Sequence, residues 1–121
     1  MQDSLEPAER RILDFEAASR ELAALTGRWV GVELSHLTGS GALLTLGGPL
    51  DRSWTFGSPP NRSQALVVGE ASMRIAESAF ARGILERYRD GRSGLEWRLV
   101  AIELRVGVLV EIEEIPTGPD R

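Results

Sequence analysis

Side chains that could carry covalent or acid-base chemistry are scarce in this sequence. It holds one histidine, one tyrosine and no cysteine, and all 14 of its basic residues are arginine. The lack of cysteine excludes thiolate catalysis and Cys-ligated zinc. The lack of lysine excludes Schiff-base chemistry and the lysine of a phosphate-binding P-loop. We therefore expect a protein that is not an enzyme, with no catalytic residue and no cofactor.

Any acid-base or pH-switch hypothesis depends on His36, because histidine is the side chain that titrates near neutral pH. Its neighbour Ser35 would point to the opposite face of a strand, so the two cannot form a Ser–His dyad. The simpler interpretation is a hydrogen-bonded histidine at the end of a hairpin. We expect His36 to be dispensable for function.

Three glutamates, Glu103, Glu111 and Glu113, fall on one face of a predicted C-terminal hairpin. Carboxylates in this arrangement could hold a calcium ion or form an acid-base pair. However, no Asp-rich loop or histidine accompanies them to complete a coordination shell, so we predict no metal site. A solvated face is the simpler interpretation, and an acidic docking surface for a basic partner is the alternative.

The segment between Gly47 and Ser63 is rich in glycine, proline and serine and is predicted to be mostly loop. Trp and Arg are enriched at binding hot spots, and a proline-stiffened loop loses little entropy on docking. The alternative is a short strand whose aromatic side chains fill the core. Four residues of this segment are predicted to bind a partner: Arg52, Trp54, Phe56 and Arg62.

Two amphipathic helices are expected to support these residues. The first covers Leu5–Thr26, with Ser4 as its cap and Gly27 as a left-handed stop. The second covers about Ala71–Arg89, where apolar residues recur at spacings of three and four and Asp90-Gly91 ends the pattern. A short buried strand over Ala65–Gly69 precedes it.

Two hairpins are predicted from alternating apolar residues. In the first, a three-residue loop Gly39–Gly41 would place Leu34 opposite Leu46, with a positive φ at Gly41.

In the second hairpin, strands Trp97–Leu104 and Val108–Ile115 flank Arg105–Gly107, with a positive φ at Gly107. This register places Val100 opposite Ile112 and Arg98 opposite Glu114. A single long strand bent at Gly107 would keep the same alternation.

The length of 121 residues, 42% of them hydrophobic, is typical of one domain, so we expect a single α+β domain over 1–121 with a frayed tail over 116–121. The predicted architecture is an antiparallel sheet of four to six strands with two helices packed on one face. Its order is helix, hairpin, loop with a possible short strand, strand, helix, hairpin. This order is similar, in topology alone, to secretion chaperones and other small partner-binding α+β folds, and no motif identifies a family.

The net charge of −4, with arginines scattered among carboxylates, argues against nucleic acid as a partner. No signal peptide and no membrane span is recognisable, so we expect no membrane partner and a cytoplasmic location. The sequence favours a non-catalytic protein-binding module, such as an adaptor, chaperone, regulator or neutraliser of a partner protein. A homodimer is expected, because the C-terminal hairpin would leave an unpaired edge.

Two other functions stay open. The first alternative is a small-ligand-binding domain with an apolar pocket between helix and sheet, lined by Trp29, Trp54, Phe56 and an arginine. The second is an enzyme that works through carboxylates or His36.

Overall fold

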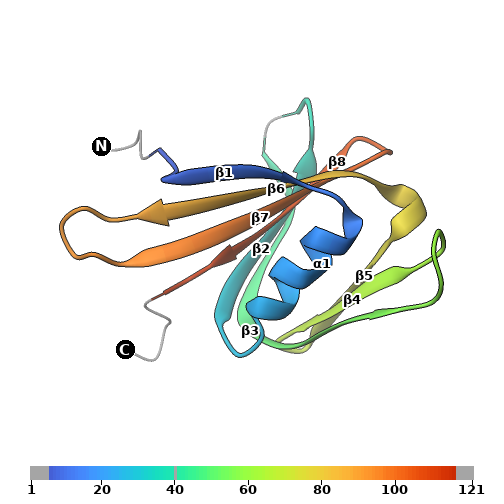
Figure 1. The fold of residues 1–121 in the computed structure, drawn as a ribbon, viewed down its shortest axis with the longest axis horizontal. Coiled ribbons are helices and arrows are strands. Elements are labelled where there is room, and N and C mark those ends of the chain that lie inside the picture. The colour runs from blue at the N-terminus through green and yellow to red at the C-terminus, as the bar shows by residue number, and fades with distance from the viewer. Residues whose placement is uncertain (1–5, 40, 117–121) are drawn as a thin grey trace.

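A computed structural model of the chain describes residues 6–39 and 41–116, and in these residues eight antiparallel strands form one sheet with a single α-helix (Figure 1). The order of strands across the sheet is β1-β6-β7-β8-β2-β3-β4-β5. The helix α1 spans Phe15–Ala24, and a short 3₁₀ turn, η1, spans Glu77–Ala79. The strands are β1 Glu9–Leu13, β2 Trp29–His36, β3 Ala42–Phe56, β4 Ser63–Val68, β5 Ala71–Ala76, β6 Phe80–Arg89, β7 Glu96–Leu104 and β8 Val108–Glu114.

The prediction of four to six strands with two helices is wrong, because the second predicted helix does not form. Residues Ala71–Arg89 form β5, η1 and β6 instead. The centre of β6 is buried on both faces, so its apolar residues do not alternate and their spacing imitates a helix. Gly83 is needed here for close approach: a Cβ at this position would lie 3.3 Å from the Cβ of Leu13 and 3.4 Å from that of Ala18.

The first predicted helix forms only in its second half. Asp14 is its N-cap, since the Asp14 carboxylate accepts a hydrogen bond from the backbone N–H of Ala17 at 2.8 Å. The preceding residues form β1, an edge strand that pairs with β6. The predicted cap Ser4 lies outside the described residues. Gly27 follows the helix with φ of +89°, as expected for its left-handed end.

The long loop predicted from Gly47 is also wrong, because β3 runs through it without a break. This strand pairs with β2 as far as Pro49 and with β4 from Leu50 onward. The change of partner occurs at a bend where glycines let two backbones meet, since a Cβ on Gly48 would lie 3.2 Å from Gly69. Only residues 57–62 form a loop.

The C-terminal hairpin and the strand predicted over Ala65–Gly69 are confirmed. Val100 pairs with Ile112 and Gly107 has φ of +88°, while the short strand is β4. The single-strand alternative is therefore wrong.

The first hairpin is confirmed only in part. Gly41 has φ of +86°, but Leu34 pairs with Leu44 rather than Leu46. The observed register differs from the predicted one by two residues, so the apolar residues keep their face but the three-residue loop is wrong. A bulge between Leu34 and Ser35 then shifts the pairing by one further residue before the turn.

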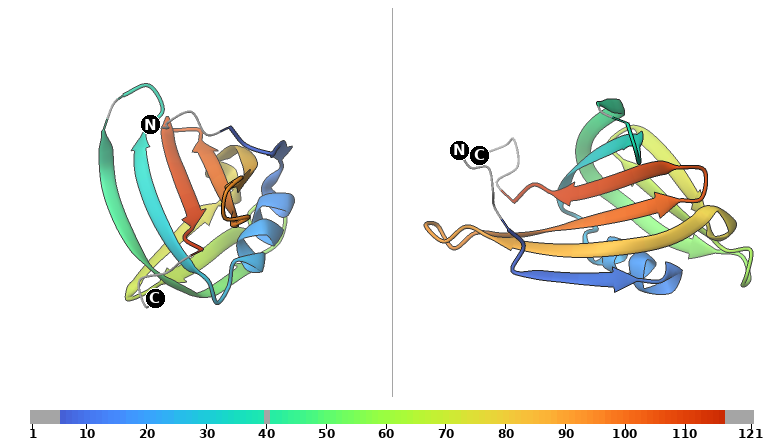
Figure 2. Two further views of the ribbon diagram at one scale, coloured as in Figure 1. Left: turned by 90° about the vertical axis from the view of Figure 1, so that its left-hand side faces the viewer. Right: turned by 90° about the horizontal axis from the view of Figure 1, so that it is seen from above.

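The sheet curves around α1, which lies inside the curve (Figure 2, left). We call the side of the sheet that packs on α1 the inner face. Leu22 and Leu25 are almost fully buried there against side chains from both halves of the sheet. Phe15 meets Phe80 edge to face at 5.6 Å between ring centroids. The helix therefore fills the space inside the curved sheet and leaves the outer face free.

Candidate functional site

Two aromatic side chains, Trp54 and Phe56, are exposed on the outer face of β3, by 37% and 41% respectively. The intervening residues point inward. Thr55 Oγ1 donates to Gln64 Oε1 at 2.6 Å, and Gln64 Nε2 donates to Ser53 Oγ at 2.6 Å, with Gln64 itself buried. Because side chains alternate along a strand, Trp54 and Phe56 must lie on the opposite face. They form part of a strand, as the alternative interpretation held, but they do not fill the core.

Each of these rings is covered by an arginine. The Arg52 guanidinium carbon lies 4.3 Å from the Trp54 ring centroid, and that of Arg74, on β5, lies 5.8 Å from the Phe56 ring centroid. Arg74 reaches across β4, where Ala65 separates it from Trp54. Cation–π contacts of this kind are worth about 0.5–1 kcal/mol at exposed sites and favour one arrangement of each ring and its arginine. We call Arg52, Trp54, Phe56 and Arg74 the aromatic face.

Arg62, which was predicted to act with these residues, is instead held by Glu77. Its Nε and Nη2 atoms donate to the two carboxylate oxygens of Glu77, both at 2.9 Å, and its backbone N–H donates to the same side chain at 3.1 Å. Its guanidinium also lies 5.2 Å from the Phe15 ring centroid. The hydrogen bonds from Arg62 lower the pKa of Glu77. Arg62 thus ties the loop to η1, and its contribution to partner binding remains a prediction.

The other sequence candidates, His36 and the three glutamates, do not meet in a single site, although Glu111 lies close to Glu113. His36 is exposed at the end of β2. Glu103 forms an ion pair with Arg82 at 3.1 Å, and Glu113 accepts a hydrogen bond from the indole N–H of Trp97 at 3.0 Å. No group of acidic or histidine side chains in the described part of the chain is arranged to hold a metal ion.

Glu111 lies directly opposite Glu33 on β2. Burial raises the pKa of Glu111, and the nearby carboxylates of Glu33, Glu113 and Glu86 raise it further. The outer face therefore carries a crowded row of negative charge at the centre of the sheet.

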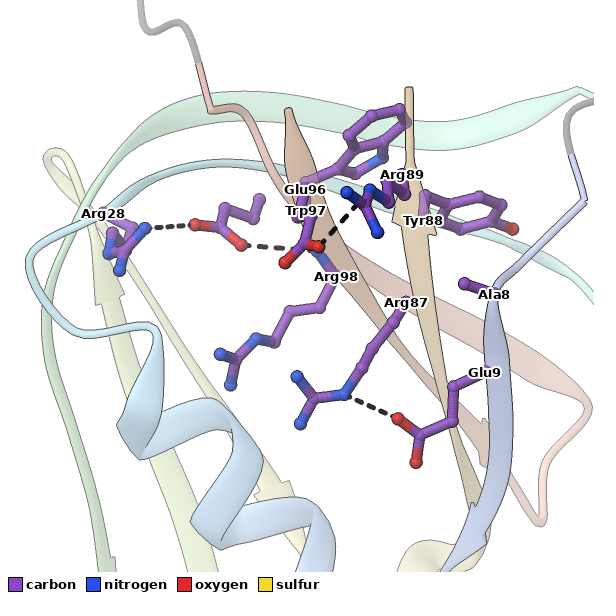
Figure 3. Close-up of a pocket in the computed structure, with 10 residues that line it drawn as sticks. Ala8, Glu9, Arg28, Arg87, Tyr88, Arg89, Glu96, Trp97 and Arg98 are labelled. Atoms are coloured by element: carbon purple, nitrogen blue, oxygen red, sulfur yellow. Dashed lines mark hydrogen bonds and ion pairs between the residues drawn. The ribbon is translucent and has the colours of Figure 1, made fainter. Parts of the chain in front are cut away.

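Sequence reasoning missed a polar pocket of about 400 Å³ on the inner face, near the end of the β6–β7 hairpin that carries its turn (Figure 3). Arg87 and Arg89 from β6, Arg98 from β7, and Arg28 before β2 line it. Arginines two apart in a strand share a face, which would have indicated the cluster had residues 80–89 been recognised as a strand.

The arginines of this pocket are engaged in ion pairs. Arg87 pairs with Glu9 of β1 at 2.9 Å, and Arg89 pairs with Glu96 at 3.7 Å. Arg28 bonds to Glu114, a carboxylate that is only 6% exposed. The predicted charge pair of Arg98 with Glu114 is wrong, because only the backbone N–H of Arg98 donates to that carboxylate, at 3.3 Å.

The side chain of Arg98 turns to Glu21 of α1 instead, at 3.2 Å. The pairs around the pocket therefore join β1, α1 and the segment before β2 to the central strands, and their chemistry is charge pairing within the fold.

A second depression, of about 380 Å³, lies between α1 and β3. Most of the residues that line it have polar or charged side chains, among them Glu16, Arg20, Ser53, Thr55 and Gln64. Of the residues predicted to line such a pocket, Trp54 and an arginine do so, but Trp29 and Phe56 do not. The apolar ligand pocket expected between helix and sheet therefore lacks most of its predicted aromatic lining here.

Comparisons with known proteins find no matching family model, no matching curated protein and no matching solved structure. Among the described residues, no helix has the length and apolar character needed to cross a membrane.

Proposed function

We propose that this protein is a non-catalytic protein-binding module that contacts its partner through the aromatic face. The observation that carries the proposal is the exposure of Trp54 and Phe56 on a paired strand, each ring covered by a guanidinium group. Large aromatic side chains held on rigid backbone lose little entropy on binding, which is why Trp, Tyr and Arg dominate hot spots. The role would be that of an adaptor, chaperone, regulator or neutraliser.

The chemistry of the aromatic face indicates what the partner must present. Arg52 and Arg74 place positive charge beside apolar rings, so a complementary surface combines an apolar patch with flanking carboxylates. A guanidinium already positioned over a ring can also bind a carboxylate with little further loss of freedom. We therefore expect a protein partner with an acidic rim around an apolar centre.

The test is quantitative capture of partner from native cell lysate by immobilised wild type, Trp54→Ala, Phe56→Ala and the control Trp29→Ala. Trp29 has a similar exposure of 36% but lies on β2, opposite Pro49, and is not part of the aromatic face. Trp54→Ala should weaken capture about 30-fold, corresponding to about 2 kcal/mol. Trp29→Ala should retain it.

Melting temperatures measured on the same samples separate lost binding from lost folding. Full capture by a well-folded Trp54→Ala protein would contradict the proposed site.

A cytoplasmic location and a homodimer also belong to this proposal. The C-terminal hairpin does not leave the unpaired edge from which a dimer was predicted, because β7 and β8 are both paired on two sides within the sheet.

A further inference from the structure

The first half of β3 presents a free backbone edge. Residues 42–49 pair with β2 on one side, while β4 pairs with β3 only from Leu50 onward. Within residues 6–39 and 41–116, no strand pairs with the other side of residues 42–47. Figure 2 (left) shows this half of β3 as the outermost strand of the curved sheet. A row of unpaired N–H and C=O groups of this kind is a template for another strand.

The side chains on this edge offer no protection against such pairing. The sequence from Ala42 to Gly48 has no charged residue and no proline, and Leu43 and Leu44 are 56% and 50% exposed. The strands at the two ends of the sheet order, β1 and β5, differ from this segment in carrying charged residues. β1 carries Glu9, Arg10 and Arg11 in succession, and β5 carries Arg74. Charged residues are the usual means by which edge strands avoid pairing with another chain.

We propose that this edge of β3 pairs antiparallel with the same edge of a second copy, forming a two-fold symmetric dimer with a continuous sheet. A two-fold axis brings the same segment of both copies together, so the side chains of this segment must be compatible with a second copy of themselves. An uncharged segment does so, because no like charges meet and the exposed leucines of each copy cover those of the other. A charged peptide strand would find no residue of opposite charge on this edge to pair with.

This inference rests on the proposed function, because it assigns the interface of the homodimer that the proposal includes. The dimer interface is a different surface from the aromatic face. The aromatic face begins at Arg52, beyond the bend of β3 at Gly48. The pairing would therefore leave both copies of the aromatic face free, and one dimer would bind two sites on a partner assembly.

The decisive variant is Thr45→Lys, compared with Ser72→Lys as a matched control. Thr45 is exposed and lies opposite Glu33 of β2, so a lysine there gains a carboxylate partner within its own fold while it charges the edge. Ser72 is an exposed residue of β5, so the same substitution charges a different edge strand. Circular dichroism and melting temperature establish that both variants fold.

Sedimentation equilibrium measures the mass of each protein in solution. The wild type and Ser72→Lys should be dimers, and Thr45→Lys should raise the dimer dissociation constant by about tenfold or more. A monomeric wild type at high concentration, or a Thr45→Lys protein as dimeric as the wild type, would overturn the inference. Failure of the proposed partner site is a separate result, because Trp54→Ala would then capture partner normally whatever the mass in solution.

Discussion

Arg87 on β6 and Arg98 on β7 lie directly opposite one another, so one cross-strand pair of the inner face carries two positive charges. Two like charges in this position destabilise a sheet unless each is neutralised. Glu9 of β1 neutralises Arg87, and Glu21 of α1 neutralises Arg98. The need to neutralise these two adjacent arginines therefore links both β1 and α1 to the central strands through ion pairs.

Glu21→Gln should destabilise the fold more than a surface substitution does. The change removes a carboxylate that pairs with Arg98 at 3.2 Å and Arg11 at 3.3 Å, and leaves Arg98 facing Arg87. We expect a loss of about 1 kcal/mol in the free energy of unfolding, reduced at high salt. Urea denaturation at low and high ionic strength measures it. Glu16→Gln, which removes an exposed helical pair with Arg20, is the control and should have little effect.

Gly107→Ala should destabilise the protein by about 1 kcal/mol or more through backbone strain alone. Gly107 has φ of +88°, but nothing lies within 4 Å of the position its Cβ would occupy. Gly91 has equally open surroundings without a positive φ, so Gly91→Ala is a matched control for the added methyl group. Equal stabilities of the two variants in urea would rule out the strain.

Glu111→Gln should stabilise the protein near neutral pH. Because the pKa of Glu111 is raised in the folded state, its stabilising contribution is full below the unfolded pKa and is lost as pH rises through the folded pKa. The neutral amide avoids that loss. After allowance for solvent screening, the melting temperature should rise by about 2 °C. The gain should vanish in acid, where Glu111 is protonated. Glu70→Gln, at an exposed position between β4 and β5, is the control for the loss of one carboxylate.

Tyr88 should remain protonated far into the alkaline range. Burial, together with the hydrogen bond that its hydroxyl donates to Glu86 Oε1 at 2.6 Å, raises the pKa of Tyr88 to about 12. It is the only tyrosine in the chain, so phenolate absorbance reports on it alone. The stability that protonated Tyr88 contributes is present below its unfolded pKa and is lost as pH rises through about 12. Glu86→Gln should lower the midpoint, and a midpoint at the ordinary value of 10.0 in the folded protein would contradict the assignment.

The parts of the fold that local sequence predicts are those whose partners are close in sequence. The β7–β8 hairpin combines regular alternation with one glycine that requires a positive φ, so both register and turn follow from adjacent residues. The second predicted helix fails because β6 pairs with β1 and β7 while α1 packs against it. Those contacts bury successive residues of β6, and no window of its sequence contains the partners responsible.

The same limit applies to the candidate site. Trp54 and Phe56 were recognisable by type, but their exposure depends on which face of β3 turns toward α1. Arg62 looked free because its partner Glu77 was placed inside a helix rather than in a 3₁₀ turn that faces the loop. Arg62 is thus hydrogen-bonded within the fold because the loop at residues 57–62 contacts η1, a contact that the sequence alone does not reveal.

The pairing of β1 with β6 also constrains how the chain folds. Glu9 pairs with Arg87 and Leu13 with Gly83. β1 is therefore synthesised early but can pair only after β6, which is synthesised much later. Contacts between distant parts of a chain slow folding, and sheets dominated by them fold in about milliseconds to seconds. Until Arg89 has left the ribosome, β1 has no strand to join, and the final closure of the sheet must follow translation of β6 rather than accompany that of α1.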